Sequence, residues 1–99
     1  MSYHAFGMEV PDEIIGSIRR YVDLGIPTVV FLEAVICNNL SLAVRLADET
    51  NLKFLPAIVD YLYSECPAGC WGWPEAFDSW IAQKDYAKRT KHAERTAAQ

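Results

Sequence analysis

Residues 29–37 form an apolar run interrupted only by Glu33, and this run most constrains how the chain can fold. Its β-branched side chains would suit a buried strand on propensity alone. The chain has no second comparable run to pair with it, however, and a lone strand leaves its backbone hydrogen bonds unmade. Pro27 also stands where a helix can begin. We therefore predict a central buried helix over about residues 28–38.

Helical periodicity precedes this run. Large apolar residues recur on one helical face after Pro11, namely Ile14, Ile18, Tyr21 and Val22. Gly25 is placed to end this helix, because glycine readily adopts the left-handed conformation that follows a last turn. Residues 1–10 show no clear period, and we expect an irregular lead-in there.

Further helices are predicted after the central run. Apolar periods cover residues 40–47, 51–63 and 74–81, and Asn38 or Asn39 can cap the first of them. Pro56 is tolerable only near a helix start, which favours a beginning within residues 51–55. The prediction is a compact, all-α single domain of four to five short helices over residues 11–83.

The net charge of −4 is unevenly distributed. Residues 1–83 carry a net charge of −7, whereas residues 84–99 carry +3 and form a basic tail, expected to be helical or frayed. No apolar run is long enough to span a bilayer, and residues 1–10 lack the pattern of a secretory signal. We expect a protein that works in the cytoplasm.

The cysteines do not form a recognisable metal or redox motif. Cys37 lies in the apolar run and is typical of a small core residue. Three residues separate Cys66 from Cys70, whereas two separate the cysteines of zinc knuckles and redox motifs, and the sequence leaves open whether Cys66 and Cys70 pair. We predict no metal, no cofactor, no catalytic residue and no enzymatic activity.

The two tryptophans around Gly72 have two interpretations. They can brace a loop against the core, or an indole can stay exposed as an anchor for a partner protein. The helical period places Tyr61 and Tyr63 toward the rim of their helix. The second interpretation assigns partner binding to an aromatic edge with nearby acids: Tyr61, Tyr63, Trp71, Trp73, Asp60, Glu65, Glu75 and Asp78. An acidic surface with aromatic anchors suits a host protein with a basic groove that normally holds nucleic acid.

Several short segments resemble a family of small helical proteins encoded by phages and prophages, most of them without an assigned function. The segments include Gly25-Ile26-Pro27, Phe31-Leu32-Glu33-Ala34-Val35 and Cys70-Trp71-Gly72-Trp73-Pro74-Glu75. The resemblance covers roughly residues 18–82, with Trp73 and Pro56 as departures. It implies a phage origin and action inside the bacterial host, and it carries over no catalytic residue.

Two functions follow from these observations. The first is a non-enzymatic phage accessory protein that binds a host protein as an inhibitor or modulator, of anti-CRISPR or other anti-defence type, by analogy of size and source. The alternative is a small nucleic-acid-binding regulator that acts through the basic tail. Direct nucleic-acid binding is the weaker hypothesis, because residues 40–47 offer only Arg45 to meet phosphates. A homodimer through exposed aromatics stays open.

Overall fold

The computed structural model describes residues 3–84, and most of them are helical. The chain begins with a small antiparallel hairpin of β1 (Tyr3–Ala5) and β2 (Met8–Val10), in which Tyr3 faces Val10. The connecting residues Phe6 and Gly7 both have positive φ, as a tight two-residue hairpin turn requires. The predicted irregular lead-in is therefore wrong, and the fold is not purely all-α. Strands of three residues are too short to give a detectable alternation.

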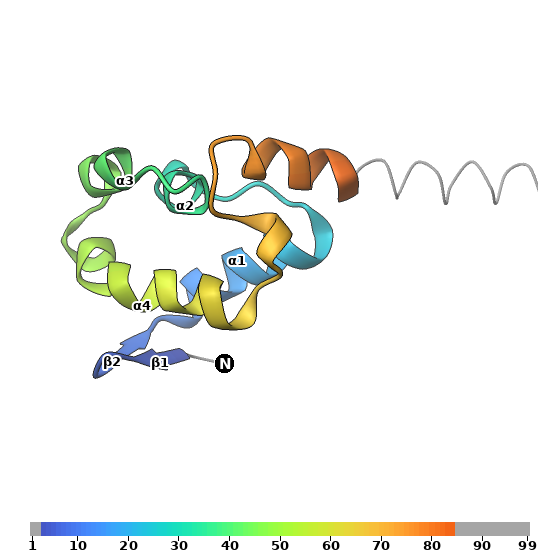
Figure 1. Cartoon of the computed structure of the whole chain (residues 1–99). Coiled ribbons are helices and arrows are strands. Elements are labelled where there is room, and N and C mark those ends of the chain that lie inside the picture. Colours follow the sequence, from blue (N-terminus) through green and yellow to red (C-terminus); the bar gives the residue numbers. More distant parts are fainter. Residues whose placement is uncertain (1–2, 85–99) are drawn as a thin grey trace, which may run out of the picture.

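The hairpin packs against α4 (Glu49–Glu65), and Figure 1 shows it below α1 (Asp12–Leu24) and α4. Val10, at the end of β2, is fully buried and joins the core. The core's other fully buried large side chains come from several helices: Ile18, Tyr21, Ile36, Ile58 and Leu62. The hairpin thus closes one side of a helical core instead of leading loosely into it.

Helix α1 follows its predicted pattern. Ile15, Ile18, Tyr21 and Val22 are buried on one face, and Asp12 and Glu13 lie in the first turn, where the helix dipole favours acids. The helix ends at Gly25, whose φ is 69° and whose N–H donates to the Tyr21 carbonyl. The predicted end of this helix is confirmed.

We expect Gly25→Ala to destabilise the protein more than Gly7→Ala. Both glycines have φ near 70°, so each substitution carries the left-handed strain of about 1–2 kcal/mol. A Cβ at Gly25 would also lie 2.6 Å from Lys84 Cβ, whereas at Gly7 it would meet nothing within 4 Å. Denaturant unfolding of both variants measures the difference. Equal losses in the free energy of unfolding would show that the helix over residues 76–84 does not pack closely against the end of α1.

Most of the run over residues 29–37 is helical, as predicted: α2 covers Val30–Ile36, with Val29 and Cys37 as its caps. Five of its side chains are buried, namely Phe31, Leu32, Ala34, Val35 and Ile36, whereas Val29 and Val30 are more than 60% exposed. The helix is therefore shorter than residues 28–38, and one face is open. An Asn38–Asn39 turn leads into α3 (Leu40–Leu46), where the Asn39 side chain caps the Leu42 N–H at 3.3 Å.

Helix α4 begins earlier than the sequence predicts. Asp48 accepts a hydrogen bond from the Asn51 N–H at 2.7 Å, so the helix starts at Glu49 and Pro56 lies inside it. Proline removes one helical hydrogen bond. The buried side chains Ala57, Ile58 and Leu62 just after it hold this part of the helix against the core.

A short turn, η1 (Ala68–Cys70), and a loop connect α4 to a last helix, described over residues 76–84. The Gly72 N–H donates to the Ile36 carbonyl at 2.7 Å, which fixes the loop to the end of α2. In Figure 1 this loop, in orange, passes beside α2. Apart from Lys84, the predicted basic tail over residues 84–99 lies outside the described residues.

Candidate functional site

The predicted aromatic edge is divided among three places on the molecule. Tyr61 is only 6% exposed, and its ring meets Tyr3 edge to face at a centroid distance of 4.9 Å. Asp60 accepts a hydrogen bond from the Tyr3 hydroxyl at 2.5 Å. Tyr61 and Asp60 therefore fasten the hairpin to α4, and the expected position of Tyr61 at the rim is wrong.

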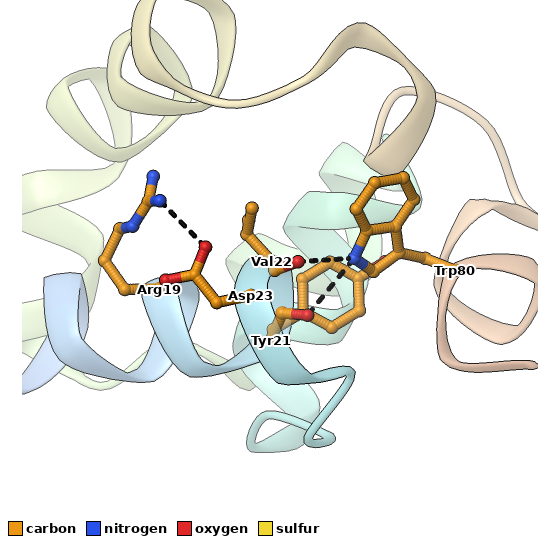
Figure 2. Close-up of polar contacts among 5 residues, drawn as sticks. All are labelled: Arg19, Tyr21, Val22, Asp23 and Trp80. Carbon is orange, nitrogen blue, oxygen red and sulfur yellow. Dashed lines mark hydrogen bonds and ion pairs between the residues drawn. The ribbon is translucent and has the colours of Figure 1, made fainter. Parts of the chain in front are cut away.

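Glu65 lines an open cleft beside these residues, together with Tyr3, Asp12 and Arg19. A hydrogen bond to Tyr61 raises the pKa of Arg19, and burial raises the pKa of Tyr61. Arg19 also pairs with Asp23, one turn further along α1, at 3.0 Å (Figure 2). The arginine is thus held by neighbours within the protein.

Tyr63 and Trp71 line a second, shallow hollow at the end of α4. Tyr63 is 79% exposed, whereas Trp71 is partly buried and packs against the core. Trp71 therefore braces the loop against the core, as in the first interpretation of the two tryptophans, and is not held out as an exposed anchor.

Cys66 and Cys70 are both free thiols and share a side-chain hydrogen bond. This bond raises the pKa of Cys66 and lowers the pKa of Cys70. His4 lies on the hairpin, 3.7 Å from Glu9, and His92 lies outside the described residues. Within residues 3–84, no three histidine, cysteine or acidic residues gather in a way that could hold a metal ion.

Trp73 occupies the third place, a groove of about 750 Å³ between α2, α3 and the loop before the last helix. We call it the α2–α3 groove. Its apolar lining includes Val30 and Ala34 of α2, Cys37 at the end of that helix, Leu40, Leu42 and Leu46 of α3, and Trp73. Trp73 is 39% exposed, so a partner protein can reach this indole, as the anchor interpretation requires.

Helix α3 leaves most of its apolar side chains outside the core. Only Ala43 is buried, whereas Leu40 is 66% exposed and Leu42, Val44 and Leu46 are each about 40% exposed. The helix lies at the edge of the molecule beside α2 (Figure 1). Leu40, Leu42 and Leu46 line the groove together with Val30, and such exposed apolar side chains around a groove mark interaction sites on monomeric proteins.

One carboxylate lies in the wall of this groove, and two others lie in the chain just after its lining residue Pro74. Glu33 lines it directly and is its one charged residue among the residues described. Glu75 and Asp78 stand at the start of the last helix, and together with Glu33 they act on the Cys37 thiol. Burial is the main cause of the raised pKa of Cys37, and these three charges raise that pKa further.

The structure therefore places the predicted residue Trp73 in the groove wall and Glu75 next to the lining residue Pro74, and it adds groove residues that sequence reasoning missed. The missed residues include Leu42, Leu46 and Glu33. A signal for them exists: Leu42 and Leu46 lie opposite Leu40 and Val44 on a helical projection, so α3 cannot bury all four against one neighbour.

No helix within the described part of the chain is long and apolar enough to cross a membrane. Comparison of the chain with protein-family models, with curated proteins and with solved structures found no match.

Proposed function

We propose that this protein is a non-enzymatic protein-binding module whose binding surface is the α2–α3 groove. The observation that carries the proposal is the exposure of α3, which has one buried residue in seven. Apolar side chains held at the surface of a folded domain gain free energy when a partner covers them, about 25 cal/mol per Å² of apolar area. An open groove with a tryptophan at its wall suits such a partner.

The carboxylates favour a protein over a nucleic acid as the partner. Glu33 and Glu75 would repel phosphates at this surface. The resemblance to phage-encoded proteins supports a bacterial host protein as the partner, with action in the cytoplasm. An inhibitory, anti-defence or anti-CRISPR role rests on that resemblance and on the analogy of size.

A photo-crosslinking amino acid at position 42 tests the proposal in cells that carry the gene. We expect a discrete crosslinked adduct with another protein from position 42, because Leu42 lines the groove. Position 24 is the matched control, since Leu24 is exposed to a similar extent, 47% against 41%, at the end of α1. Identical adducts at both positions, or none at position 42, would contradict the proposal.

A further inference from the structure

The walls of the α2–α3 groove are built from two helices. On α2, Val30 and Ala34 are one turn apart and Cys37 caps the end of the helix, and on α3 Leu42 and Leu46 are one turn apart. The lining that the structure describes comes from these helices and from loops, so the groove presents side chains and no strand edge. Such a surface receives the ridge of another helix, whereas an extended peptide needs a free strand edge.

The charges are placed on one side of this apolar surface. Glu33 on α2 lines the groove, and the exposed Glu75 directly follows Pro74, which lines it as well. Helix α3, on the other side, carries a single charged residue, Arg45. The acidic charge of residues 1–83, net −7, adds a long-range field of the same sign.

We propose that the α2–α3 groove binds a cationic amphipathic helix of the partner protein, with an apolar row in the groove and lysine or arginine side chains beside Glu33 and Glu75. This inference rests on the proposed function and specifies the chemistry of the partner. The apolar row supplies contact area, and the charge pattern selects the sequence and orientation of the bound helix.

Two synthetic helical peptides test this with the full-length chain. Both have leucine at positions i, i+4, i+7 and i+11, and their flanking residues are lysine in one and glutamate in the other. We expect the lysine peptide to bind at least about tenfold more tightly at low ionic strength, by fluorescence anisotropy, and to lose much of this advantage in high salt. Equal binding, or tighter binding of the glutamate peptide, would overturn the inference.

Variants without particular carboxylates show which of them cause the preference for the lysine peptide. We expect E33Q/E75Q to weaken binding of the lysine peptide by several-fold and to leave the glutamate peptide unchanged or slightly tighter. The matched control is E13Q/E65Q, which removes two exposed carboxylates of α1 and α4 outside the groove lining. An equal loss in the control would show that net charge, and not the groove, selects the peptide.

If something other than a cationic helix of a partner covers the α2–α3 groove, these experiments give different results. If a second copy covers the groove, the wild-type chain sediments as a dimer and L42D dissociates it. If the basic tail of this chain covers it, K88Q/R89Q/K91Q/R95Q tightens binding of the lysine peptide. Either result overturns the inference. If position 42 crosslinks a partner but the peptides are not distinguished by charge, the proposed function stands and the cationic helix does not.

Discussion

We expect Tyr21→Ala to lower the free energy of unfolding by about 3–5 kcal/mol, the range for removing a large buried aromatic side chain. Tyr21 is fully buried and stacks on Phe77 at a centroid distance of 5.1 Å. Its hydroxyl donates to the Cys70 carbonyl at 2.9 Å and lies 3.4 Å from the Ala76 carbonyl. One side chain therefore joins α1 to η1 and to the start of the last helix.

The midpoint of thermal unfolding measures this loss. For a domain of this size, each kcal/mol lowers the midpoint by about 4–8 °C, so we expect a decrease of at least about 12 °C. Tyr21→Phe is the control, because it keeps the ring and removes only the hydroxyl. That variant should lose about 1–3 kcal/mol, the cost of leaving a buried carbonyl without a partner. A loss in Tyr21→Phe as large as in Tyr21→Ala would contradict a packing role for the ring.

We expect Trp80→Ala to lower the free energy of unfolding by about 3 kcal/mol, the low end of the range for this substitution because the ring is only partly buried. The indole N–H approaches the Tyr21 and Val22 carbonyls at 3.2 and 3.1 Å, at the end of α1 (Figure 2). The last carbonyls of a helix lack partners within it, and the indole supplies one. Lys84 Nζ lies 5.0 Å from the ring centroid and covers the same indole.

Trp80→Phe separates the hydrogen bond from the packing. It keeps an aromatic ring and removes the N–H donor, so we expect about one third to one half of the loss seen in Trp80→Ala. Urea unfolding followed by circular dichroism gives both values. If Trp80→Phe is as stable as the wild type, the indole does not cap α1 and the end of that helix depends on Gly25 alone.

The candidate site could be predicted only in part. Trp73 and Glu75 were identified because an aromatic residue among acids is a local feature of the sequence. Tyr61 was assigned to the rim because its helical neighbours give no sign of the hairpin that covers it. The same hairpin accounts for Tyr3, which contacts α4 across 57 residues of chain. No local pattern encodes a contact over that distance.

Local interactions determined much of this protein from its sequence. The glycine that ends α1, the asparagine that caps α3 and the helical state of residues 30–36 all follow from neighbouring residues, because caps and helical periods act within one or two turns. The tertiary structure alone decided which apolar residues stay outside the hydrophobic core. The core buries only Ala43 of α3, and the loop tied to Ile36 places Trp73 beside the exposed leucines. Burial depends on which elements meet in space, and a short helix that is apolar on opposite flanks can turn only one of them inward.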